Sequence, residues 1–286
     1  RMWATSGLWG GSLLFRCGRS LTGGTSWADI NAGLPPSTQW YTRIRSDQAQ
    51  PPTLYTNNGA QVYASTNLGD LWTAANAVPF PAGVRELTVG VHDGAATAIY
   101  ACLDSPTTGR RLRVFDGTTW SERDAGLVPG VLVRKVAPHP TDPRRCFALM
   151  NGMGTPGSKV YRSDDNGQNW TTITGNLPDV PLADLVAHPD DPQRLYVGTE
   201  FGAYASENGG MSWQRWNLGL PEAAIITEMA LVDLRRSDGP SSDRLMVAVG
   251  TYGRGIWTRP IPMGISAAPQ PQAVAAHSCV VSHYQH

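Results

Sequence analysis

The chain has 286 residues and equal numbers of basic and acidic side chains, 23 of each, so its formal net charge is zero. A surface that binds nucleic acid usually needs a basic excess, so we predict no nucleic-acid partner. No apolar run approaches the length of a membrane span. The 31 glycines and 22 prolines are too many for a mainly helical protein. Composition therefore predicts a turn-rich, all-β fold without a membrane span.

Short apolar runs separated by turn residues predict β-strands along the whole chain, and their order repeats. We call the four strands of one repeat A, B, C and D. The first repeat starts at a B strand, residues 2–5, and four complete repeats follow. The clearest of them has strands at residues 182–187, 195–200, 202–206 and 213–217. The last repeat supplies strands A, B and C at residues 227–232, 245–249 and 255–258.

The turn between strands C and D has a recurring motif, S-x-[D/N/T]-x-G-x-x-W. Its two clearest copies consist of Ser163, Asp165, Gly167 and Trp170, and of Ser206, Asn208, Gly210 and Trp213. Two further copies end at Trp27 and Trp72, and a degenerate copy ends at Trp120. We count Trp257 as the last tryptophan of the series. These tryptophans recur every 43 to 50 residues, which is the length of one four-stranded propeller blade.

The motif resembles the Asp-box, or BNR repeat, of sialidases, sortilin-type receptor domains, two-propeller xyloglucanases and photosystem assembly factors. The resemblance covers nearly the whole chain and implies a β-propeller of four-stranded antiparallel blades. We predict six blades, or seven if N-terminal sequence is missing. Residues 1–261 form the predicted propeller, and residues 262–286 form a tail whose end can supply a closing strand or lie outside the fold. Because the same turn decorates enzymes, receptors and assembly factors, it says little about activity.

The chemistry of the motif points to a structural role. Gly167 can adopt a positive φ in the turn without steric cost, and the Asp165 carboxylate can accept hydrogen bonds from the backbone of its own turn. Trp170 is predicted to pack between neighbouring sheets. Asn208 occupies the same slot as Asp165 without a carboxylate, so we interpret the slot as a turn brace rather than a catalytic position.

A site is predicted at the end of the blades where strand A begins and strand B turns into strand C. Aligning the A strands places one ionisable residue from each at equivalent positions: Arg43, Glu86, Lys135, Asp184 and Glu228. The B–C loops add Glu200, Tyr252 and Arg254. This row is either a hydrated entrance whose charges pair with one another, or a site for a polar ligand. In the second case we expect Arg43, Lys135, Tyr252 and Arg254 to bind the ligand.

Two classes of function follow. The preferred one is a non-catalytic binding or assembly module for a glycan or protein partner, because aromatic residues outside the motif, namely Trp3, Trp9, Trp40, Trp216, Phe201 and Tyr252, suit such surfaces. The alternative is a glycoside hydrolase, which needs two nearby carboxyl groups. Its candidate catalytic residues are Asp184, Glu228, Glu86 and Glu200.

The enzyme families that share this motif match the sequence less well. Sialidases resemble one another in an F/Y-R-I-P motif, and the nearest approach here, at residues 42–45, lacks the proline. Xyloglucanases have two propellers, whereas this chain has one. A calcium-dependent hydrolase of lactonase type needs oxygen ligands around its ion. In this chain Arg43 and Lys135 would lie at that position and repel the calcium ion.

The remaining polar and sulfur residues suggest no cofactor and no metal. Cys17, Cys102, Cys146 and Cys279 have no CxxC spacing, and they are either buried thiols or members of disulfides. His139 and His188 are expected to brace their A–B loops. We expect an exported protein, although the chain contains no signal segment.

Overall fold

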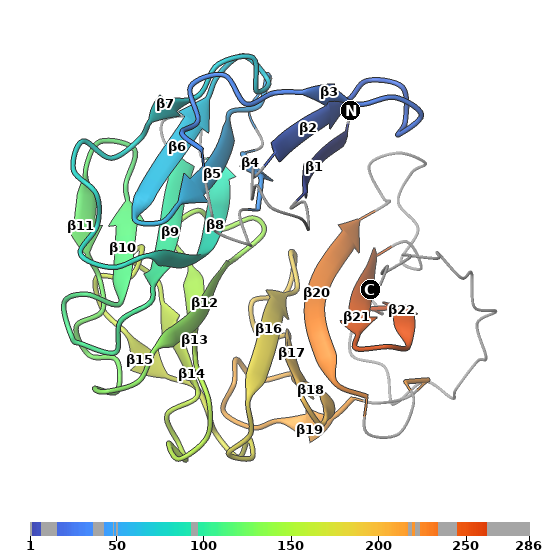
Figure 1. Cartoon of the computed structure of the whole chain (residues 1–286). Coiled ribbons are helices and arrows are strands. Elements are labelled where there is room, and N and C mark those ends of the chain that lie inside the picture. The colour runs from blue at the N-terminus through green and yellow to red at the C-terminus, as the bar shows by residue number, and fades with distance from the viewer. Residues whose placement is uncertain are drawn as a thin grey trace. The chain divides into compact units, whose positions relative to one another are not determined.

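The computed structural model describes residues 2–6, 16–36, 43–47, 49, 51–92, 97–216, 219–220, 224–233 and 245–261. All regular elements within these ranges are β-strands, as Figure 1 shows. Nothing in the described part of the chain is a helix that could cross a membrane. The predicted tail, residues 262–286, lies outside these ranges.

The chain divides into two compact units, which are described separately. The first contains Arg1–Ala148 and Ser163–Thr171, and the second contains Leu149–Arg162 and Thr172–His286.

The first unit begins with a three-stranded sheet of β1 (Met2–Ser6), β2 (Arg16–Ser20) and β3 (Ala28–Asp29). A four-stranded sheet follows, made of β4 (Arg45–Ser46), β5 (Leu54–Asn58), β6 (Gln61–Ser65) and β7 (Thr73–Ala74). The next sheet contains β8 (Val84–His92), β9 (Thr97–Leu103), β10 (Leu112–Phe115) and β11 (Trp120–Glu122). Each sheet is formed by consecutive strands, as a meander requires.

The fourth sheet has strands on both sides of the boundary: β12 (Val133–Pro138), β13 (Cys146–Met150), β14 (Val160–Ser163) and β15 (Thr171–Thr172). The second unit continues with β16 (Leu182–Ala187), β17 (Leu195–Thr199), β18 (Gly202–Ser206) and β19 (Gln214–Arg215). It ends with a three-stranded sheet of β20 (Ile226–Asp233), β21 (Leu245–Thr251) and β22 (Gly255–Pro260).

These six sheets confirm the predicted all-β class and the predicted order of strands. In the clearest repeat, strands A and C have the predicted bounds, whereas strand D is shorter than predicted. Trp257 is the exception in the tryptophan series, and it lies in strand C as predicted. Trp257 lies in β22, the third strand of its sheet, opposite Val249 of β21, so it does not follow a C–D turn. Its sequence distance from Trp213 fits the period of the repeat, but Trp257 does not occupy the position that the other tryptophans occupy in their sheets.

The tryptophans that follow C–D turns join neighbouring sheets. The indole Nε1–H of each donates to the carbonyl that directly follows strand D of the preceding sheet: Trp72 to Ile30 at 2.7 Å, Trp120 to Ala75 at 2.9 Å, Trp170 to Arg123 at 2.7 Å, and Trp213 to Ile173 at 3.1 Å. Trp27 belongs to the first described sheet, and its indole instead donates to Gly24 in its own turn. Each of these five indoles therefore satisfies its one donor.

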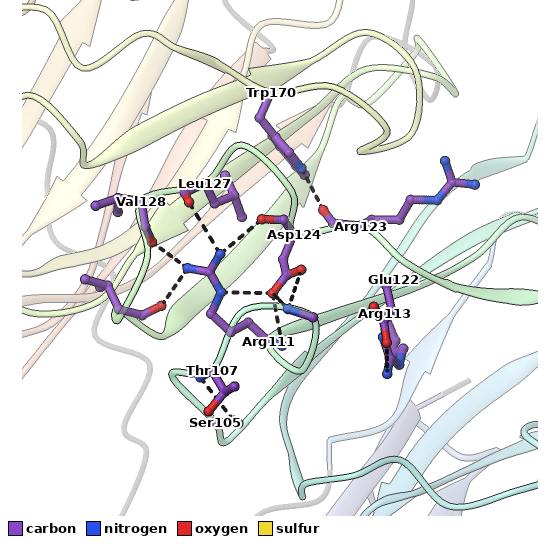
Figure 2. Close-up of polar contacts among 12 residues, drawn as sticks. Ser105, Thr107, Arg111, Arg113, Glu122, Arg123, Asp124, Leu127, Val128 and Trp170 are labelled. Carbon is purple, nitrogen blue, oxygen red and sulfur yellow. Dashed lines mark hydrogen bonds and ion pairs between the residues drawn. The ribbon is translucent and has the colours of Figure 1, made fainter.

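A second repeated contact ties the loop before strand C to the loop after strand D; we call it the loop bracket. In the sheet of β8 to β11 it is an ion pair between Arg111 and Asp124, both buried, with 2.9 Å between Nε and Oδ2 (Figure 2). In the sheet of β4 to β7 the same slot holds neutral residues, where Gln61 donates to the Asn76 backbone carbonyl at 2.6 Å. The bracket fixes the loops at the end of the sheets where the site was predicted.

Candidate functional site

The C–D turn at Ser163 is closed by its own side chains. The Ser163 hydroxyl donates to Asp165 at 2.7 Å and accepts from the Gly167 N–H at 2.7 Å, and Gly167 has a φ of 82°. Asp165 also accepts from the N–H and the side-chain amide of Asn169, at 2.9 and 2.7 Å. The carboxylate is thus engaged within its own turn.

The turn at Ser206 repeats this pattern without a carboxylate. Ser206 donates to Asn208 at 2.9 Å and accepts from the Gly210 N–H at 2.8 Å, and Asn208 accepts from the Ser212 N–H at 2.9 Å. Since an amide oxygen closes one turn and a carboxylate closes the other, the slot requires an acceptor rather than a charge.

Asp165→Asn is therefore expected to destabilise the protein by less than about 1 kcal/mol at neutral pH, because the amide keeps the acceptor and the exposed Asn169 can rotate. Burial would raise the pKa of Asp165, but hydrogen bonds from Asn169 and Ser163 lower it below its ordinary value. A depressed pKa in the folded state adds stability that is present above the unfolded value and is lost as the pH falls through the folded value. Urea melts at pH 7 and pH 3 should show a smaller acid loss for Asp165→Asn, and an equal loss would contradict this role.

The predicted row of ionisable residues begins in the first unit. Glu86 follows a β-bulge in β8, and its carboxylate lies 2.7 Å from Arg45 Nη2 and 3.7 Å from Arg43 Nη1. Arg43 itself precedes β4, so the A strand is shorter than predicted there. Lys135 lies in β12 and is half-buried. Glu86 is thus buried against two guanidinium groups, and one of them, Arg45, was not among the predicted site residues.

The second unit contains the other two members of the row at matching bulges. Asp184 follows a bulge in β16, and Glu228 follows one in β20. Asp184 is only 1% exposed, and its two oxygens accept from the N–H groups of Leu185 at 2.8 Å and Met229 at 2.9 Å. Asp184 therefore connects two neighbouring A strands, and it lies beside the backbone of Glu228.

Three exposed apolar side chains gather at the same end of the second unit. Phe201 in the β17–β18 turn is 50% exposed, Tyr252 in the β21–β22 turn is 75% exposed, and Ile225, directly before β20, is 44% exposed. The Tyr252 N–H donates to the Ile225 carbonyl at 2.9 Å. Gly198 of β17 leaves no room for a Cβ beside Ile226 and Met229, so β17 and β20 are in close contact at this end.

We call this group, together with the exposed Glu200 and Arg254 of the same turns, the turn patch. Glu200, Tyr252 and Arg254 were predicted site residues, whereas Ile225 was not. The sequence feature that could have identified Ile225 is the apolar run Ala224-Ile225-Ile226. In the structure Ala224 and Ile226 are buried and Ile225 faces outward.

Other predicted residues lie elsewhere. Trp3 and Trp216 are half-buried against core clusters and are not surface aromatics. Trp216 lies 4.7 Å from Tyr196 and beneath the Arg259 guanidinium, at 4.5 Å, so neighbouring side chains cover it. Trp9 and Trp40 lie outside the described residues.

Histidine and cysteine side chains have structural surroundings. The Nδ1 atoms of His139 and His188 accept from Asp142 and Asp190 N–H groups, both at 3.1 Å, as expected for loop braces. Cys17, Cys102 and Cys146 are buried free thiols, and burial raises the pKa of each to about 12. Cys279 lies outside the described residues. Within the described ranges, His, Cys, Asp and Glu form no group of three that could hold a metal.

Comparison with known proteins supports the fold. Neither a family model nor a curated protein matches the sequence. Among solved β-propeller structures, YCF48 from Cyanidioschyzon merolae is similar with a TM-score of 0.58 and 13% identity, covering 86% of this chain and 77% of that one. YCF48 bound to D1 peptide has a TM-score of 0.57 and 17% identity, covering 88% and 73% of the two chains.

A glycosidase has the same type of fold. The GH74 xyloglucanase from Xanthomonas campestris has a TM-score of 0.64 and 17% identity, covering 94% of this chain but only 44% of the enzyme. This chain therefore corresponds to less than half of that enzyme. At these identities the likenesses show a β-propeller fold, shared by a peptide-binding protein and by hydrolases.

Proposed function

We propose that the chain is a non-catalytic binding module built from Asp-box repeats, and that its turn patch binds a protein partner. The observation that supports this proposal is the exposure of Phe201, Ile225 and Tyr252 on one end of two contacting sheets. Exposed apolar groups with polar neighbours at one end of a sheet are typical of interaction sites, and aromatic anchors commonly dominate binding energy.

The surroundings of the predicted carboxylates favour binding over hydrolysis. A glycosidase needs one carboxyl group to hold a proton while the other acts as base or nucleophile. Both oxygens of Asp184 accept backbone N–H groups, and the Glu86 carboxylate is paired with two arginines, so structural contacts already engage both groups. Glu228 and Glu200 remain as hydrolase candidates, and hydrolysis of a glycan is the alternative to be tested.

The fold neighbours include precedents for both possibilities. YCF48 is bound to a peptide in one structure, and GH74 enzymes share the fold. A protein partner is preferred to a glycan because Ile225 adds an aliphatic contact to the two aromatic ones. Export of the chain remains a prediction from the repeat resemblance, to be tested by cell fractionation.

The test compares Phe201→Ala/Tyr252→Ala with Met211→Ala, a change at an even more exposed apolar residue in a C–D turn. Partners cross-linked to the wild-type protein in its native cells should be lost at least tenfold from the double variant, since each anchor contributes about 2 kcal/mol or more. The Met211 variant should retain them.

Two parallel assays examine the alternatives. Binding to a glycan array that disappears in the double variant would replace the protein partner with a carbohydrate. Turnover of aryl glycosides that disappears in Glu228→Gln or Asp184→Asn, with an unchanged circular dichroism spectrum, would replace the binding module with an enzyme. Equal partner loss from the double variant and from Met211→Ala would contradict the turn patch.

A further inference from the structure

A groove of about 510 Å³ lies in the first unit, and it shares no lining residue with the turn patch. Its walls are the loop at residues 75–81, between β7 and β8, and the outer strands β10 and β11 with the turn that joins them. The volume is within the range of sites that hold small ligands or short peptide segments. None of the predicted site residues lines it.

The wall of the groove is mostly apolar. Phe80 packs edge-on against Trp120, with ring centroids 5.0 Å apart, and the Phe115 ring centroid lies 5.4 Å from that of Trp120. Val78 at the rim is 74% exposed, and Pro79 and Pro81 beside it are also exposed. Because the Trp120 indole N–H already donates to Ala75, the aromatic wall presents carbon rather than donors.

One end of the groove has a charged group with unused bonding capacity. Arg113 of β10 is paired across the sheet with Glu122 of β11, and its Nη2 lies 2.8 Å from the Glu122 carboxylate. Arg113 is only 13% exposed, and its Nη1 has no acceptor among the described residues. Burial lowers the pKa of Arg113, the Asp124 carboxylate partly opposes this shift, and neighbouring Arg110 lowers the pKa further. A buried guanidinium donor without an acceptor is costly, and a carboxylate matches its fork geometry.

We propose that this groove binds an extended peptide segment that carries a bulky apolar side chain and, close to it, an aspartate or glutamate. The apolar side chain would lie against Val78, Phe80 and Trp120, and the carboxylate would pair with Arg113. A neutral sugar suits the groove less well, because it has no carboxylate to pair with Arg113. The site is independent of the turn patch, so each can fail without the other.

The experiment is selection of a phage-displayed library of random dodecapeptides on the full chain, with counter-selection against Val78→Asp. Val78 is exposed, so this change leaves the fold intact while it places a negative charge where the apolar side chain of the peptide must lie. We expect enriched peptides to combine an aromatic or aliphatic residue with Asp or Glu. Their synthetic versions should bind the wild type at least about tenfold more tightly than Val78→Asp or Arg113→Met.

Matched variants and peptides make the result decisive. Arg19→Met is the control, because Arg19 is also largely buried and pairs with an exposed aspartate, Asp70, at 2.9 Å. It should bind the selected peptides as the wild type does, and so should Phe201→Ala/Tyr252→Ala. Replacing Glu by Gln in a selected peptide should reduce its affinity about tenfold. The proposal is overturned if no peptide is enriched, if affinity ignores Arg113 and Val78, or if the Gln peptide binds equally well.

Discussion

Trp213→Ala is expected to lower the free energy of unfolding by about 3–5 kcal/mol, the range for truncating a buried tryptophan. Trp213 is buried, and its indole donates to the Ile173 carbonyl, which follows strand β15. The substitution removes the ring that covers this contact and leaves the carbonyl without its donor. Urea denaturation followed by circular dichroism measures the loss.

Trp27→Ala is the matched control, because Trp27 ends the same motif in the first described repeat. Its ring is nearly half exposed and its indole donates only to Gly24 within its own turn. The expected cost is less than about 1 kcal/mol, as for most surface substitutions. Equal losses for Trp213→Ala and Trp27→Ala would show that the contact between neighbouring sheets does not contribute the difference.

This contrast marks what the motif could and could not predict. The period and the turn residues predicted the strands well, since local alternation and glycine positions set them. The burial of each tryptophan depends instead on whether strand D of a preceding sheet lies beside it. Trp213 and Trp72, whose indoles bond to the sheet before them, are buried, whereas Trp27, whose indole bonds within its own turn, is exposed. Trp257 fits the period although it lies in the predicted strand C, because spacing alone does not distinguish strand C from the start of strand D.

The candidate site likewise contains features that the sequence predicted and features that it could not predict. Alignment of the A strands placed Glu86, Asp184 and Glu228 at equivalent positions, and all three follow a β-bulge. Their partners were not predictable from the repeat. The acceptor role of Asp184 depends on a backbone N–H one sheet away, at Met229, and that contact arises from packing between sheets rather than from local sequence.

Arg111→Met is expected to cost about 3–5 kcal/mol, because it leaves the buried Asp124 carboxylate without its counterion. The Arg111 guanidinium also donates to the backbone carbonyls of Leu127, Val128 and Val131, and these lose their donors together (Figure 2). Arg113→Met, two residues along the same chain segment, is the control. The Glu122 partner of Arg113 is mostly exposed, so this change should cost less than about 1 kcal/mol.

The neutral bracket of the preceding sheet supplies a sharper test, since Gln61 and Asn76 hold the same slot there without charge. Arg111→Gln and Asp124→Asn each leave one buried charge uncompensated, so each alone should cost about 3 kcal/mol or more. The double variant removes both charges and rebuilds the neighbouring bracket, so it should be more stable than either single variant. Chemical denaturation of the four proteins gives the coupling directly. If the double variant instead loses the sum of the two single losses, the pair contributes through its separate contacts with the loops rather than as an ion pair. In that case the charged and neutral brackets would not be interchangeable solutions to the same problem of holding two loops at the end of a sheet.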